Sequence, residues 1–217
     1  MRIIILEGSN QQNPLQLVIF SPMIKNALIF IFSLMLSNAA LAERIEFDMS
    51  VFGFKFGKMI LTKTEVNDSI VLYTLNAKGK TDFLWMKREE ESVFTVEYRN
   101  GKLYSSDYEY LNKGNVEKWS KIRFNGSNYI AESNEGSRTY TEPLDYSLIR
   151  LYFEPTIERN KVFCEEDCTY AEMTRKDEKL NIRCQDGSRS TYYLDDGKIE
   201  AMEIHLAVAT VKLTRVN

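Results

Sequence analysis

The segment IEFDMSV, residues 45–51, alternates strictly between apolar and polar side chains. Ile45, Phe47, Met49 and Val51 are separated by two acidic residues and a serine. Because successive side chains of a β-strand point to opposite faces, this alternation predicts a strand with one buried face. A strand of this kind is typical of an antiparallel sheet that covers a core with one face and meets water with the other.

The same alternation recurs through most of the chain beyond residue 43. Asn100-Gly101 separates two such runs, and this dipeptide favours a type I′ hairpin turn. Asp186-Gly187 and Asp195-Asp196-Gly197 separate later runs. They predict tight turns, because glycine accepts positive φ without steric cost. Regularly spaced strands joined by tight turns predict a mainly all-β protein, an antiparallel meander that forms a curved sheet or open half-barrel.

Residues 143–153 break this two-residue period. Leu144, Leu148, Leu151 and Tyr152 recur at the spacing of one helical face. The proline that begins the segment suits a first helical turn, and a second proline shortly after the segment ends it. We therefore expect one short amphipathic helix here, packed with its apolar face on the sheet.

The first 42 residues have a different composition. After Met23 come a lysine, an apolar run over residues 27–36 and a small-residue ending at Ala42, which are the three parts of a secretory signal. The apolar run is shorter than the roughly 20 residues that span a bilayer. We expect translation to start at Met23, after an upstream segment, and cleavage to follow Ala42. The mature product is then a single β-rich domain, residues 43–217, without a transmembrane segment, located in the periplasm or secreted.

The three cysteines, Cys164, Cys168 and Cys184, all lie in this mature part. An oxidising compartment permits a disulfide. Cys168 and Cys184 flank a predicted hairpin, whereas Cys164 and Cys168 flank a short acidic loop, and the sequence does not choose between these pairings. Their spacing matches no standard zinc pattern and His205 is the only histidine, so we predict no metal site.

Several classes of function lack the residues they need. The formal net charge of -3 provides no broad basic surface for nucleic acid. His205 has no identifiable catalytic partner, and neither a Gly-x-Ser-x-Gly elbow nor a glycine-rich phosphate loop is present. The acidic runs at residues 89–91 and 165–167 lack the spacing of a calcium loop, so we interpret them as solvated. We therefore expect neither an enzyme nor a cofactor.

Aromatic side chains are plentiful, and most of them should be core or cross-strand partners. The apolar cluster Phe83-Leu84-Trp85-Met86 lies between two predicted strands, outside a clear alternation. Burial explains such a cluster best, because exposed apolar patches are uncommon. The alternative is that it lines an apolar cavity, and on that hypothesis Phe83, Trp85 and Trp119 are the candidate ligand-binding residues.

Four stretches also resemble a known family in their order and spacing: residues 52–57 (FGFKFG), 100–103 (NGKL), 148–155 (LIRLYFEP) and 185–197 (QDGSRSTYYLDDG). Together they are similar to a family of exported bacterial envelope proteins known only as a domain of unknown function, over essentially all of residues 43–217. The resemblance implies a curved antiparallel sheet, in outline like the half-barrels of periplasmic lipoprotein carriers. It supplies no activity and no functional residues.

These observations favour an exported, non-catalytic envelope protein that binds a lipid or other apolar ligand on the concave face of its sheet. The alternative is a structural or protein-interaction module of the cell envelope, and the third hypothesis is an uncharacterised hydrolase. The expected partners are an apolar small molecule or an envelope protein.

Overall fold

The structure is a computed structural model, and it describes residues 42–83, 86–156, 158–206 and 209–216, without the side chains of residues 81–88. The chain divides into two compact units, Met1–Ala39 and Ala40–Asn217. The described residues all belong to the second unit. The predicted signal segment, apart from Ala42, lies outside the described residues, as does the segment before Met23.

The described residues form one 14-stranded antiparallel sheet, which confirms the predicted fold class. Its order is β8-β7-β6-β5-β4-β3-β2-β1-β14-β13-β12-β11-β10-β9. The strands are β1 Ala42–Val51, β2 Phe54–Asn67, β3 Ile70–Phe83, β4 Met86–Arg99, β5 Lys102–Asn112, β6 Asn115–Phe124, β7 Tyr129–Ser133, β8 Gly136–Tyr140, β9 Lys161–Cys164, β10 Thr169–Lys176, β11 Lys179–Arg183, β12 Arg189–Asp195, β13 Lys198–His205 and β14 Thr210–Arg215. Two meanders, β1–β8 and β9–β14, are thus joined side by side through β1 and β14, where Met49 lies opposite Leu213.

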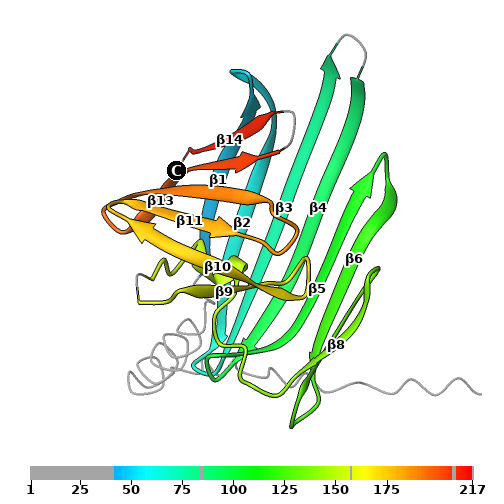
Figure 1. Cartoon of the computed structure of the whole chain (residues 1–217), viewed down its shortest axis with the longest axis vertical. Coiled ribbons are helices and arrows are strands. Elements are labelled where there is room, and N and C mark those ends of the chain that lie inside the picture. The colour runs from blue at the N-terminus through cyan, green and yellow to red at the C-terminus, as the bar shows by residue number, and fades with distance from the viewer. Residues whose placement is uncertain (1–41, 84–85, 157, 207–208, 217) are drawn as a thin grey trace, which may run out of the picture. The chain divides into compact units, whose positions relative to one another are not determined.

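The sheet is strongly curved, so that β10, β11 and β13 cross one face of β1 and β2 (Figure 1). Contacts join the two meanders through the space between them. The ring of Tyr152 lies 6.3 Å from that of Phe47 on β1 and 5.9 Å from that of Tyr192 on β12. Tyr108 on β5 donates a hydrogen bond to the Glu166 carboxylate, which follows β9. One hydrophobic core therefore lies on the concave side of the sheet and includes residues of both meanders.

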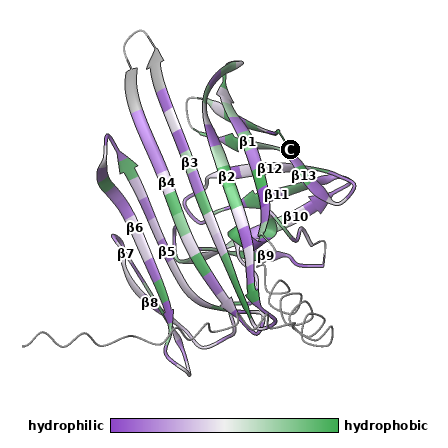
Figure 2. Ribbon diagram, turned by 180° about the vertical axis from the view of Figure 1, so that it is seen from behind, coloured by the Kyte–Doolittle hydropathy of each residue, from purple (hydrophilic) through white to green (hydrophobic). Residues whose placement is uncertain are grey.

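The alternation has the predicted consequence over residues 45–49, whereas Val51 at the end of β1 is only half-buried. Ile45 and Phe47 are 2% and 0% exposed, and Met49 is buried with them. Hydrophobic and hydrophilic stretches also follow one another along β2, β3 and β4, although residues 89–92 of β4 form an unbroken hydrophilic run (Figure 2). Burial of apolar area contributes about 25 cal/mol per Å² to the free energy of unfolding, so this alternation determines which face is internal.

The hairpin turns confirm one prediction and add an unexpected feature. Asn100 and Gly101 have φ values of 49° and 74°, as a type I′ turn requires. Phe52 and Gly53, between β1 and β2, have φ values of 51° and 81°. Positive φ is unusual for a bulky residue, and Phe52 is 78% exposed. The ring of Phe52 therefore contributes little packing to offset its backbone strain.

The predicted helix is present but shorter than residues 143–153. Helix α2 comprises only Leu148–Leu151, because Ser147 before it is extended and bridges to Phe163 on β9. Leu144 and Leu151 are buried as predicted. No helix within the described parts of the chain combines the length and apolarity needed to cross a membrane.

Candidate ligand-binding cavity

A cavity of about 350 Å³ lies between the two meanders, on the concave side of the sheet. Its wall includes residues of β1–β5, α2, β9 and β12–β14. Most of the wall is apolar, and its buried members include Met49, Met59, Leu75, Ile149, Tyr192 and Leu213. Ligand pockets in proteins commonly enclose roughly 300–1,000 Å³ and are mainly apolar. The cavity thus has the size and chemistry of a small-molecule site.

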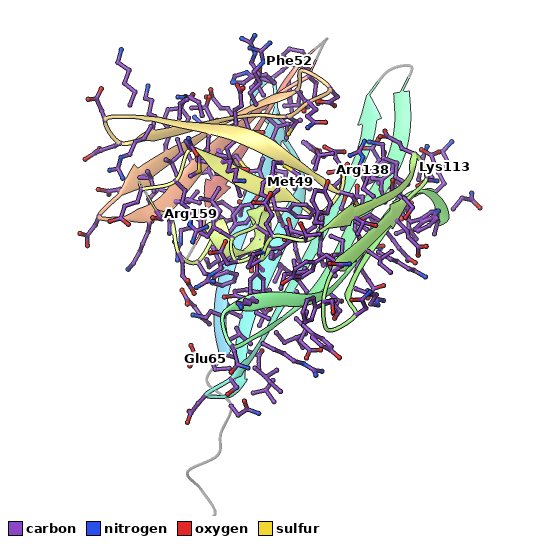
Figure 3. All side chains as sticks on the ribbon, turned by 60° about the horizontal axis from the view of Figure 1, so that its bottom comes forward. Met49, Phe52, Glu65, Lys113, Arg138 and Arg159 are labelled. Carbon is purple, nitrogen blue, oxygen red and sulfur yellow. The ribbon has the colours of Figure 1, made fainter. Side chains whose placement is uncertain are left out.

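Two paired glycines make room for side chains of the cavity wall: Gly79 lines the cavity, and Gly57 lies against Met49, which lines it. Gly57 on β2 lies opposite both Gly79 on β3 and Met49 on β1. A Cβ atom on Gly57 would lie 2.3 Å from the Lys78 carbonyl oxygen, and one on Gly79 would lie 2.7 Å from the Phe56 ring. The absence of these two side chains leaves room for Met49 and Phe56 in the cavity wall. Met49 lies between the two meanders (Figure 3).

Phe56 reaches the cavity because of an irregularity in the β1–β2 register. Met49 pairs with Gly57 but Ser50 pairs with Lys55, so Phe56 is the extra residue of a β-bulge. A bulge redirects side chains locally and increases the twist of the strand. Sequence reasoning recognised the glycine-rich FGFKFG segment but not the bulge, because the bulge becomes apparent only when the partner strand is known.

The polar part of the wall is acidic. Five carboxylate residues line the cavity, and its described lining includes no lysine, arginine or histidine. Two of these residues, Glu90 and Glu91, lie on β4, and Glu165, Glu166 and Asp167 form the turn after β9. Lysines bind two of the carboxylates from outside the lining: Lys78 lies 3.4 Å from Glu91, and Lys118 lies 3.5 Å from Glu166.

Glu165 is the most deeply buried of these acids, at 1% exposure. Its two carboxylate oxygens accept hydrogen bonds from the backbone N–H groups of Leu148 (3.2 Å) and Ile149 (3.3 Å), at the start of α2. Ser120 donates a 2.6 Å bond to the Glu165 carbonyl. Burial nevertheless raises the pKa of the carboxyl group to about 7, because the charged form loses its hydration. The residue therefore anchors α2 and also presents a titratable group to the cavity.

The two acids after Glu165 are half-buried. Tyr108 donates a 3.0 Å hydrogen bond to Glu166. The pKa of Asp167 is raised, first by burial and then by repulsion from Glu166. The interpretation of residues 165–167 as solvated charge is therefore wrong. The turn folds under α2 and against β5, which the sequence pattern alone does not reveal.

Neither predicted disulfide pairing is formed, and all three cysteines are free thiols. In the β10–β11 hairpin Glu172 lies opposite Arg183. The next residue, Cys184, therefore lies beside Ala171 and not opposite Cys168. The Cys168 sulfur instead lies 3.8 Å from the carbonyl oxygens of Glu132 and Glu165.

The two thiols that do meet are Cys164 and Cys184, whose sulfur atoms are 3.9 Å apart in the cavity wall. Their mutual hydrogen bond, together with burial, raises the pKa of Cys164 far above its usual value. The same hydrogen bond lowers the pKa of Cys184.

The sequence of this region matches a described family. A family model described as Domain of unknown function (DUF6134) matches residues 47–216. The chain belongs to the DUF6134 family. The match contains every residue that lines the cavity, from Met49 to Leu213. No curated protein and no solved structure matches the chain.

Within the DUF6134 region, the predicted ligand-binding aromatic residues lie elsewhere or are not described. Trp119 on β6 lines a separate hollow of about 50 Å³ with Asn134, whose side chain accepts a hydrogen bond from the Trp119 backbone N–H. The side chains of Phe83 and Trp85 lie outside the described part of the structure, so their role stays a prediction. Among the described residues, no three His, Cys, Asp or Glu residues converge to hold a metal ion.

Proposed function

We propose that this DUF6134 chain is an exported, non-catalytic envelope protein that binds an apolar small molecule in the cavity between its two meanders. The single observation that supports this most is the cavity itself, about 350 Å³ with a mainly apolar wall. An engineered apolar cavity of only about 150 Å³ binds benzene, so this cavity has room for a larger apolar group. Transfer of such a group from water into the cavity is favourable in proportion to the apolar area it buries.

The apolar part of the wall is built to persist without a ligand. Met59 and Leu213 are fully buried residues of central strands, and Leu75 lies on the neighbouring strand β3. Strand pairing fixes their positions, because Met59 lies opposite Phe47 and Leu213 lies opposite Met49. A binding site that is largely formed before the ligand arrives avoids the entropy cost of ordering its own side chains when the ligand binds.

The export part of the proposal is supported by the three-part signal pattern of residues 23–42. It predicts that the protein isolated from its own cells begins at Glu43. Mass spectrometry of the purified protein and sequencing of its N-terminal peptide would show this directly. Recovery of a peptide that extends upstream of Ala42 in the mature protein would contradict it.

The binding proposal is tested by filling the cavity. The fluorescence of a neutral dye such as N-phenyl-1-naphthylamine should increase in the presence of the purified protein. Ala77→Phe should weaken the binding of this dye at least about tenfold, because the new ring occupies the cavity. Ala201 is a suitable control, since it is half-exposed on β13 and is not part of the wall. Ala201→Phe should bind the dye like the unmodified protein.

The dye experiment has two contrary outcomes. If the dye does not bind, or if it binds equally to both phenylalanine variants, the cavity is not a ligand site. Thermal unfolding of each variant shows whether a loss of binding comes from loss of the fold.

A hydrolase is the second candidate, and one observation favours it. Glu165 and Asp167 line the same cavity, and both have raised pKa values, as the acid of a hydrolytic pair requires. Non-catalytic binding is better supported, because both carboxylate oxygens of Glu165 already hold α2. Turnover of chromogenic ester or glycoside substrates, abolished by Asp167→Asn, would establish the hydrolase instead.

A further inference from the structure

A row of polar side chains crosses the β9–β14 meander on the face opposite the cavity. Strand pairing places Glu172 beside Arg183, Arg183 beside Arg189 and Arg189 beside His205, on β10, β11, β12 and β13. All four residues are exposed and line an open hollow of about 650 Å³. Ile182, next to Arg183 in the chain, is buried in the core on the other side of the sheet. The row therefore belongs to the outer face of the meander and not to the cavity wall.

The direct pairing of the two arginines is unfavourable for the sheet. Residues paired in this way have Cβ atoms roughly 4.5–5.5 Å apart, and like charges there are destabilising. Within the described part of the chain, neither the Arg183 nor the Arg189 guanidinium has an ion pair, a hydrogen bond or a ring contact. His205 brings no negative charge to Arg189, since its ring nitrogens lie 3.5 and 3.3 Å from the hydroxyl groups of Thr191 and Thr210.

The two acidic residues of the neighbourhood do not neutralise this pair. Glu172 lies opposite Arg183, but it also lies opposite Lys161 on its other side, and in the described structure it forms an ion pair with neither. The carboxylate of Glu203, which is also on β13, accepts a 2.9 Å hydrogen bond from the Tyr193 hydroxyl. The hollow therefore keeps two adjacent guanidinium groups whose donors point to solvent or to a ligand.

We propose that Arg183 and Arg189 form a binding site for a phosphate group on the outer face of the β9–β14 meander. Guanidinium groups bind carboxylates and phosphates through paired, charge-assisted hydrogen bonds. One guanidinium already occupies both oxygens of a carboxylate in this arrangement. A phosphate group has three acceptor oxygens, so that two guanidinium groups can bind it together and their mutual repulsion is relieved. This site is independent of the proposed function, because it lies on the other face of the sheet from the cavity.

The test is a titration of the ¹⁵N-labelled full-length protein with inorganic phosphate at about pH 7, with sodium acetate as the carboxylate comparison. Ionic strength is held constant, because salt screens exposed charges. We expect the backbone amide signals around Arg183 and Arg189 to shift and to saturate. Phosphate should bind at least about tenfold more tightly than acetate.

A double variant identifies the residues responsible. Arg183→Gln/Arg189→Gln should weaken phosphate binding at least about tenfold, and it should not lower the unfolding temperature in the absence of phosphate, because it removes a repulsive pair. Lys176→Gln/Lys198→Gln is the matched control, since it removes two positive charges from exposed positions of the same meander that do not line the hollow. The control should bind phosphate like the unmodified protein.

A second arm distinguishes a lipid head group from a soluble phosphate compound. It measures cosedimentation with vesicles of equal amounts of phosphatidylcholine and phosphatidic acid, and with vesicles of phosphatidylcholine alone. Cosedimentation that requires phosphatidic acid and is lost in Arg183→Gln/Arg189→Gln would support the site with a lipid as the source. Binding of inorganic phosphate without cosedimentation would support the site with a soluble compound as the source.

Three results would overturn the proposal. Inorganic phosphate may leave the signals around the two arginines unchanged, acetate may bind as tightly as phosphate, or the arginine double variant may bind phosphate like the unmodified protein. None of these results depends on whether the dye binds in the cavity, so the failure of this site and the failure of the proposed function are seen separately.

Discussion

Glu165 gives the fold a pH dependence that can be measured by changing one residue. Its carboxyl group is buried, and its pKa is raised from 4.5 to about 7. As the pH rises above 4.5, the unfolded chain releases this proton while the folded protein still retains it. Ionisation therefore favours the unfolded state, and stability falls as the pH rises toward about 7 and is constant above it.

The magnitude follows from the two pKa values. One pH unit corresponds to about 1.4 kcal/mol of unfolding free energy, so the interval from 4.5 to about 7 corresponds to about 3 kcal/mol. Tyr98 and Tyr152 interact electrostatically with this carboxylate and stay neutral over this range, because burial raises both of their pKa values. Asp167 contributes a separate effect of the same sign, since its pKa is also raised.

The substitution Glu165→Gln isolates the contribution of this one group. Urea unfolding of both proteins between pH 4.5 and pH 8 gives the difference in unfolding free energy at each pH. We expect the unmodified protein to lose about 3 kcal/mol relative to Glu165→Gln over this interval. Glu109→Gln is the control, because Glu109 is exposed on β5, and its profile should follow that of the unmodified protein. The burial argument is refuted if the difference in unfolding free energy between the two proteins is constant with pH. It is also refuted if the unmodified protein gains stability relative to Glu165→Gln as the pH rises.

Three further substitutions test the packing, the turn and the thiols. Gly57→Ala should destabilise the fold by about 2–3 kcal/mol in urea unfolding, because the added Cβ would lie 2.3 Å from the Lys78 carbonyl oxygen. An unchanged unfolding midpoint would mean that β2 and β3 can separate at this position without cost. Phe52→Asn should raise the unfolding free energy by about 1 kcal/mol, because asparagine tolerates the positive φ of this turn and the exposed ring contributes little packing. A loss of stability would show instead that the ring of Phe52 packs against a partner. Cys184 should be the first cysteine to react with a thiol reagent at about pH 8, because its pKa is lowered whereas that of Cys164 is raised. Cys184→Ser should remove this fast phase of labelling. Fast labelling that persists in Cys184→Ser would show that another cysteine is the reactive one.

The strands were predictable because the information that specifies them is local. The alternation of Ile45, Phe47 and Met49 gives their burial, and Asn100-Gly101 gives the type I′ turn. Both depend only on a few neighbouring residues, on the two-residue period of a strand and on the φ values that glycine permits.

The cavity was not predictable in this way, because residues distant in sequence form it. The pairing of β1 with β14 brings Met49 opposite Leu213, and the curvature of the sheet brings the turn at residues 165–167 to β5. The acidic run that contains Glu165 has the composition of a solvated loop, and nothing in its local sequence indicates burial. The cysteines show the same limit, since the contact between Cys164 and Cys184 depends on how β9 and β11 are placed around β10.

The central claim, that an apolar ligand occupies this cavity, is tested most directly by NMR of protein labelled at its methionine methyl groups. Met49 and Met59 line the cavity, whereas Met173 is buried in the same core but is not part of the wall. On titration with decanol, a neutral molecule with a long apolar chain, we expect the methyl signals of Met49 and Met59 to shift progressively and to saturate, while that of Met173 stays in place. Unchanged signals from Met49 and Met59 at decanol concentrations that displace the bound fluorescent dye would contradict the claim.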